Sequence, residues 1–220
     1  MIKKLIYILI LFLTCANFTL AQPQNAGIEY NSLEYSFKKF NIKKVLKTAD
    51  TNMLLFQKAK TESDKKKYLD AAMKNYYIAT KVNSKLIDGY IGLARVYDAM
   101  KLDRLAKEFF FKSVNIDTYN PRVNFYFGDF YFKRDEYLSA LFHYKISYQN
   151  GYSKNYELNY RLGIIYEKLA DIETAKKFYM NALKLKPKNK DLYEKIRLLN
   201  DINYEDSQYY LYRKTNKYVP

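Results

Sequence analysis

The stretch RLGIIYEKLADIETAKKFYMNALKLKP, residues 161–187, sets a glycine, two alanines and a proline at fixed distances among bulky side chains. Its second half places Ala175, Tyr179 and Ala182 at positions i, i+4 and i+7, which share one face of a helix. Pro187 ends that helix, because proline lacks the backbone N–H that a helix interior needs. The stretch therefore predicts two helices joined by a short turn.

The same spacing recurs upstream. The residues that define it are Leu162, Gly163, Tyr166, Ala175, Tyr179, Ala182 and Pro187. The copy 35 residues earlier reads Phe127, Gly128, Tyr131, Ala140, Tyr144 and Ser147, and the copy a further 34 residues earlier reads Leu93, Ala94, Tyr97, Ala106, Phe110 and Ser113. A half copy follows as Ala72, Tyr76 and Ala79. A period of about 34 residues predicts a solenoid of helical pairs.

The small residues explain why the distances are fixed. Gly163 and Ala175 lie twelve positions apart, and both complete upstream copies keep this separation. Across a short turn this separation places two small residues opposite each other, where the backbones of the paired helices approach closely. Tyr166 and Tyr179 are expected to fill the space beside that contact.

With these residues the chain resembles the tetratricopeptide repeat family, whose signature is W-x2-L-G-x2-Y, then A-x3-F, then P. The resemblance implies an all-α fold, a tetratricopeptide-type right-handed superhelical solenoid of antiparallel helix pairs. The chain departs from the signature in having no tryptophan; that column holds Tyr90, Asn124 and Asn159. Thr118 and Tyr152 replace the closing proline in two units.

The pattern divides the chain into segments. Pro121 suits the first turn of a helix, and Ser63 is the expected N-cap of a second helix that follows it. The predicted segments are a signal peptide (1–21), an N-terminal segment with a degenerate first helix (22–52), a repeat array (53–189, with units at about 53–86, 87–120, 121–154 and 156–189), a capping helix (190–202) and a Tyr-rich tail (203–220). The tail is expected to pack on the last unit; the alternative is a free recognition segment.

The first residues, MIKKLIYILILFLTCANFTLAQPQ, have the layout of a secretory signal peptide, with Lys3 and Lys4 before an apolar run. Cleavage after Ala21 predicts an exported protein, periplasmic or secreted, and the junction resembles exports of Bacteroidota. Two alternatives keep the protein at a membrane: an uncleaved anchor, and a lipid on Cys15. Cleavage also removes the one cysteine, so that packing alone would hold the mature protein together.

The formal charge of +15 raises the question of an anionic partner such as nucleic acid. Lysines are scattered along the chain, whereas nucleic-acid footprints cluster on one face. Export also separates the protein from nucleic acid, and loss of Lys3 and Lys4 lowers the charge from +15 to +13. We therefore expect no nucleic-acid partner.

Sequence motifs for catalysis or metal binding are missing. The chain has one histidine, His143, expected to be an ordinary packed or surface residue, and it has no HExxH, phosphate-binding glycine loop, GxSxG or CxxC motif. The sequence predicts a non-enzyme without cofactor or metal.

A partner surface is expected on the first helix of each pair. Two positions beyond Leu93, Phe127 or Leu162 is a rotation of about 200°, which points away from the packing face and selects Arg95, Asp129 and Ile164. With helical neighbours and flanking residues, the predicted partner-binding groove contains Arg95, Asp98, Arg122, Phe125, Tyr126, Asp129, Phe132, Tyr160, Arg161, Ile164 and Glu167. For Phe125, Phe132 and Ile164, packing against neighbouring units is an equal alternative.

These features predict an exported scaffold or adaptor whose partner is another protein or peptide segment of the cell envelope. Arginine and aromatic side chains commonly anchor such interfaces. One alternative is a glycan binder that stacks Tyr and Phe on sugar rings. Another is a membrane-surface protein, whose binding would weaken as salt rises.

Overall fold

The computed structural model describes residues 41–200. The predicted signal peptide, Cys15 and the predicted Tyr-rich tail lie outside the described residues.

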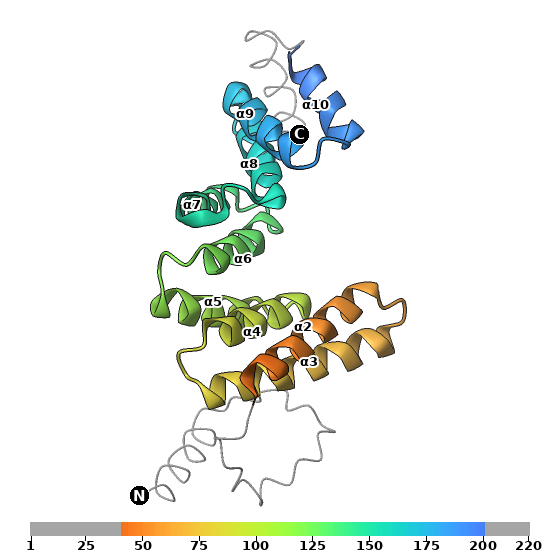
Figure 1. The fold of residues 1–220 in the computed structure, drawn as a ribbon, viewed down its shortest axis with the longest axis vertical. Coiled ribbons are helices and arrows are strands. Elements are labelled where there is room, and N and C mark those ends of the chain that lie inside the picture. Colours follow the sequence, from red (N-terminus) through yellow and green to blue (C-terminus); the bar gives the residue numbers. More distant parts are fainter. Residues whose placement is uncertain (1–40, 201–220) are drawn as a thin grey trace, which may run out of the picture. The chain divides into compact units, whose positions relative to one another are not determined.

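Antiparallel helical pairs follow one another along the described chain (Figure 1). They are α2 (Ile42–Lys58) with α3 (Glu62–Val82), α4 (Ile87–Ala99) with α5 (Asp103–Ile116), α6 (Pro121–Phe132) with α7 (Tyr137–Ser147), and α8 (Tyr156–Lys168) with α9 (Ile172–Leu185), followed by α10 (Lys190–Asn200). A short π-helical segment, η3 (Tyr148–Tyr152), precedes α8. Residues 41–200 contain no strand, and the prediction of an all-helical repeat solenoid is confirmed.

The first pair differs in detail from the sequence prediction. Helix α2 begins at Ile42, so the division predicted at residue 53 falls inside this helix. The predicted N-cap Ser63 is wrong, because Thr61 caps α3 by accepting the Asp64 N–H at 3.1 Å and donating its hydroxyl to the Asp64 carboxylate at 2.8 Å. This reciprocal pair satisfies a helix-end donor that Ser63, already inside the first turn, cannot reach.

The same type of backbone turn joins the two helices in each of the three later pairs. Lys101, Asp135 and Ala170 have φ of 62°, 58° and 68°. Beside each, an N–H bonds back to a tyrosine carbonyl: Leu102 to Tyr97 at 2.9 Å, Glu136 to Tyr131 at 3.1 Å and Asp171 to Tyr166 at 3.0 Å. This Schellman pattern satisfies carbonyls at the end of a helix.

Tyrosine rings cover three glycines of the first helices. A Cβ built on Gly128 would lie 2.5 Å from the ring of Tyr144, and one on Gly163 would lie 2.5 Å from the ring of Tyr179. Gly92 meets Tyr76 of the preceding pair in the same way, at 2.2 Å. Glycine is therefore required by an aromatic ring lying over the first helix, and the nearest neighbour of each glycine is the tyrosine rather than the alanine that the spacing suggested.

Aromatic and aliphatic side chains fill the space between helices. Phe110 stacks on Phe127 with ring centroids 4.8 Å apart. At the C-terminal end of the described residues, α10 packs through Leu192, Ile196 and Leu199 against Ala175, Tyr179 and Ala182 of α9. None of the helices described here combines the length and the apolar character needed to span a bilayer.

Candidate functional site

The first helices α4, α6 and α8 and the last helix α10 are linked in a row by side-chain contacts. Across each junction an acid of one helical pair meets a base of the next pair or of α10. The pairs are Asp88 with Arg122 (2.6 Å), Asp98 with Lys133 (2.7 Å) and Arg134 (2.9 Å), Asp103 with Arg134 (2.5 Å), Asp129 with Arg161, and Glu167 with Lys195 (2.8 Å). In all of these pairs the acid precedes the base in the chain.

At the junction between α4 and α6, the guanidinium groups of two arginines lie near the ring of one tyrosine. The guanidinium of Arg95 lies 4.4 Å from the centroid of the Tyr126 ring, and that of Arg122 lies 6.0 Å from it. Arg122 also donates to the carboxylate of Asp88 at 2.6 Å. Arg95, Arg122 and Tyr126 are all half-buried, so the cluster keeps part of its surface open to a partner.

Three side chains meet around the buried carboxylate of Asp129 at the junction between α6 and α8. The Tyr144 hydroxyl donates to the Asp129 carboxylate at 2.6 Å, and the Arg161 guanidinium donates to the same carboxylate oxygen. Burial raises the pKa of Asp129, although the charge of Arg161 and the Tyr144 hydrogen bond act in the opposite direction. The guanidinium of Arg161 also lies near the rings of Phe125 and Phe132.

The junction between α8 and α10 repeats this arrangement with other residues. The Tyr179 hydroxyl donates to Glu167 at 2.6 Å, and Lys195 donates to the other oxygen of that carboxylate at 3.1 Å. In the first pair, Tyr76 donates to Asp50 at 2.6 Å. A tyrosine of the second helix thus holds a carboxylate of the first helix in three of the four described pairs.

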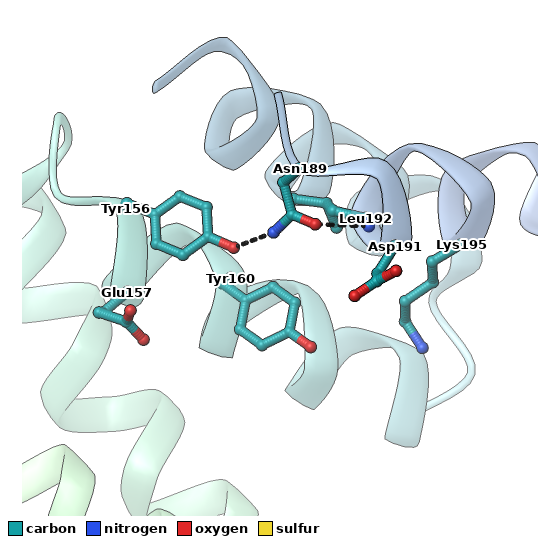
Figure 2. A pocket seen from close by; sticks show the side chains of 7 residues that line it. All are labelled: Tyr156, Glu157, Tyr160, Asn189, Asp191, Leu192 and Lys195. Carbon is teal, nitrogen blue, oxygen red and sulfur yellow. Dashed lines mark hydrogen bonds between the residues drawn. The ribbon is translucent and has the colours of Figure 1, made fainter. Parts of the chain in front are cut away.

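A pocket of about 340 Å³ opens between α8 and the start of α10 (Figure 2). It is lined by Tyr156, Glu157, Tyr160, Asn189, Asp191, Leu192 and Lys195. Asn189 fixes its wall by donating to the Tyr156 hydroxyl at 2.8 Å and accepting the Leu192 N–H at 3.0 Å. The rings of Tyr156 and Tyr160 are parallel, with centroids 6.0 Å apart.

The structure separates the predicted groove residues into two groups. Six are held at the junctions: Asp98 and Asp129 are buried with their carboxylates paired, Phe125 is buried, and Phe132, Arg161 and Glu167 contact the adjacent unit. Ile164 packs with the cluster of α9 and α10. Arg95, Arg122 and Tyr126 contact one another across the α4–α6 junction, and these three residues and Tyr160 are half-buried. Partner binding at all eleven predicted residues stays a prediction.

Asp98 and Asp129 have a structural role within the chain, and their role as partner contacts stays a prediction. A buried carboxylate is costly unless it is paired and hydrogen-bonded, and these two already have such partners within the chain. Their ion pairs therefore fix one unit against the next.

Sequence reasoning missed the residues that complete the junctions and the pocket, among them Asp88, Lys133, Asp191 and Lys195. A signal for them was present: Asp88 and Arg122 are separated by 34 residues, one repeat period. Comparing charges one period apart would have found this pair.

His143 is a packed residue. Its ring lies 4.3 Å from that of Phe127, and its Nδ1 lies 2.9 Å from Oδ1 of Asn124. Burial lowers the pKa of His143 to about 4. The described part of the chain contains no group of three or more His, Cys, Asp or Glu side chains placed to hold a metal ion.

Comparisons with known proteins agree with this architecture. Residues 156–189 match the family model described as tetratricopeptide repeat. No curated protein matches the chain.

Three solved structures are similar over most of the chain. PilF from Pseudomonas aeruginosa has a TM-score of 0.61 and 18% identity, over 80% of this chain and 75% of its own. MamA has a TM-score of 0.52 and 22% identity, over 79% and 99%. YrrB, described as a TPR protein with an unusual peptide-binding site, has a TM-score of 0.52 and 15% identity, over 73% and 82%. At these identities the likeness shows the fold alone; the chain thus contains a tetratricopeptide repeat at residues 156–189 within a helical-repeat fold that it shares with a solved TPR protein.

Proposed function

We propose that this protein is a scaffold that binds a segment of another protein along the row of first helices, in the cell envelope and without catalysis. A protein of the same fold, YrrB, is described as having a peptide-binding site. Repeat solenoids of this kind commonly present extended binding surfaces.

The observation that carries the proposal is the cluster of Arg95, Arg122 and Tyr126. Arginine and tyrosine are the residue types enriched at the energetic centres of protein interfaces. Here they come from two adjacent first helices, stack on one another and remain half-buried. Because the ion pair with Asp88 holds Arg122 in place, a partner would meet side chains that are already ordered.

The envelope location rests on the N-terminal sequence. It is tested by isolating the protein from its host and determining the N-terminus by mass spectrometry. Cleavage before Gln22 supports export, and a lipid on Cys15 supports an anchored protein. A retained N-terminal Met in a cytosolic fraction would contradict the location.

Photo-crosslinking in the native host tests the binding surface. A photoreactive residue replaces Tyr126, and a matched probe replaces Lys177, which is exposed on the second helix α9. A discrete crosslinked protein from the Tyr126 probe alone is the expected result, and mass spectrometry then identifies the partner. Equal labelling from both probes, or none from either, would remove the first-helix surface as the binding site.

A further inference from the structure

The second residues of α4, α6, α8 and α10 form a column of charged side chains along the array. Each of these residues lies two positions after the residue that precedes its helix. They are Asp88 of α4 (after Leu86), Arg122 of α6 (after Asn120), Glu157 of α8 (after Asn155) and Asp191 of α10 (after Asn189). Neighbours in this column are 34 or 35 residues apart. They therefore occupy equivalent places at successive junctions.

The charges of this column are opposite at the α4–α6 junction and alike at the α8–α10 junction. Asp88 and Arg122 have opposite charges and form an ion pair at 2.6 Å. Glu157 and Asp191, separated by the same 34 residues, are both acids. Where the α4–α6 junction holds a guanidinium between a carboxylate and a tyrosine ring, the α8–α10 junction has two carboxylates and a pocket.

The walls of that pocket suit a planar cation. Figure 2 shows the Tyr160 ring reaching the pocket from α8 and the Asp191 carboxylate reaching it from the start of α10. No cation of residues 41–200 forms an ion pair with Asp191. An arginine side chain stacks on aromatic faces and donates to carboxylates through a fixed fork of N–H groups.

Two lysines near the pocket, Lys186 and Lys195, do not pair with Asp191. Lys195 is bound to Glu167 at 2.8 Å. Lys186, at the end of α9, lies 3.7 Å from the Tyr156 ring centroid, but it approaches Glu157 only to 3.8 Å and is more than half exposed. Lys186 thus lies over the Tyr156 ring, whereas no cation among residues 41–200 forms an ion pair with Asp191.

We propose that the pocket between α8 and α10 binds an arginine side chain of the partner polypeptide, held by the tyrosine rings and by Asp191 and Glu157. The inference rests on the proposed function and names the chemistry of one partner residue. Arg122, seated between Asp88 and Tyr126, is the internal model for the bound guanidinium.

Titration with a small probe tests the pocket in the full chain. N-acetyl-arginine methylamide is added to protein with ring-labelled tyrosine, and NMR shifts of Tyr156 and Tyr160 are followed. We expect saturable shifts with millimolar affinity, and weaker or no shifts with the uncharged isostere N-acetyl-citrulline methylamide. Asp191→Asn should weaken binding roughly threefold, since exposed ion pairs contribute modestly. The matched control Glu173→Gln, on the exposed surface of α9, should leave the affinity unchanged.

A second variant supplies the cation from within the chain. Asp191→Arg recreates the arrangement of Asp88 and Arg122, and it should abolish the shifts caused by the added arginine. It should also raise the melting temperature more in the wild-type background than in the Glu157→Gln background. Equal shifts from arginine and citrulline, or probe binding unaffected by Asp191→Arg, would overturn the assignment. If the pocket does not bind arginine but crosslinking from Tyr126 still captures a partner, the scaffold proposal stands and only the arginine site is rejected.

Discussion

Gly163 shows at the residue scale why the repeat tolerates so little change. Its missing side chain makes room for the Tyr179 ring, because a Cβ would lie 2.5 Å from that ring. Gly163→Ala should therefore lower the free energy of unfolding by about 2 kcal/mol, a typical cost of overpacking a core. Chemical denaturation measures the change.

A double variant separates this contact from other effects of alanine. In the Tyr179→Leu background the ring is gone, so the added methyl group should cost little, and helix propensity favours alanine over glycine by about 1 kcal/mol. An equal loss of stability in both backgrounds would contradict the ring contact as the reason for glycine at this position.

Burial of His143 predicts that the fold is sensitive to mild acid. Asn124 uses both amide hydrogens on the carbonyls of Thr118 and Asn120, so its oxygen accepts a hydrogen from Nδ1 of a neutral His143. Burial lowers the pKa of the folded histidine to about 4, while an unfolded histidine titrates near 6.5. The unfolded chain therefore takes up the proton first.

Stability should be complete above about pH 6.5 and fall by about 1.4 kcal/mol per pH unit as the pH decreases toward 4. In His143→Asn the side-chain amide can replace the Nδ1 hydrogen bond, and the slope between pH 6.5 and 5 should flatten. Denaturation curves across this range test the effect, and an unchanged slope in the variant would exclude His143 as its source.

The sequence allowed only part of this residue-level description. Size classes are visible in the spacing, so Gly163, Ala175 and Tyr179 were recognised as packing residues. The hydrogen-bond partner of His143 was not recognised. Asn124 belongs to the preceding helix, and its side-chain amide is oriented by hydrogen bonds to the carbonyls of Thr118 and Asn120 before that helix.

At the scale of the elements, the turns that close α4, α6 and α8 use residues in the left-handed region. Ala170 has a φ of 68°, a conformation that favours glycine because a Cβ crowds the backbone there. Ala170→Gly should raise the free energy of unfolding by about 1 kcal/mol, measured by thermal or chemical denaturation. Ala59→Gly is the control, since Ala59 has a φ of −67° and should show no gain.

Where the repeat signature is complete, the structure has the helical pairs that the sequence predicts. The first pair is the exception, because α2 lacks the Leu-Gly-Tyr spacing and contacts α3 through Ala49 and Met53 instead. Its start at Ile42 is set by the Asn41 side chain, which accepts the Lys44 N–H at 3.0 Å, a cap that the repeat pattern does not reveal.

At the scale of the whole array, the acid–base pairs couple one unit to the next. Arg161→Met keeps an apolar stem but leaves the buried Asp129 without its cation, which should cost about 3 kcal/mol. Hydrogen exchange should then rise in α8–α10 more than in α4 and α5, because a repeat array unfolds by its weakest junction. Lys65→Met, at the exposed pair with Glu62, should cost under about 1 kcal/mol. Equal effects of the two variants would contradict a special role for the α6–α8 junction.

These junctions explain what sequence reasoning could not reach. The predicted groove treated each first helix as a separate surface, and so assigned Asp98 and Asp129 to a partner. In the array those carboxylates face the next unit, whose Lys133, Arg134 and Arg161 are supplied about one period later in the chain. Pairing depends on which side chains two stacked units bring together, and a single helical face does not contain that information.

The tyrosines beneath these carboxylates have one more consequence. Burial and the adjacent acids raise the pKa of Tyr76, Tyr144 and Tyr179 well above that of an ordinary phenol. In an alkaline titration followed by tyrosinate absorbance, these three of the 25 tyrosines should ionise only when the array opens. A protein without tryptophan thereby carries its own optical signal of unfolding, spread over three of its helical pairs.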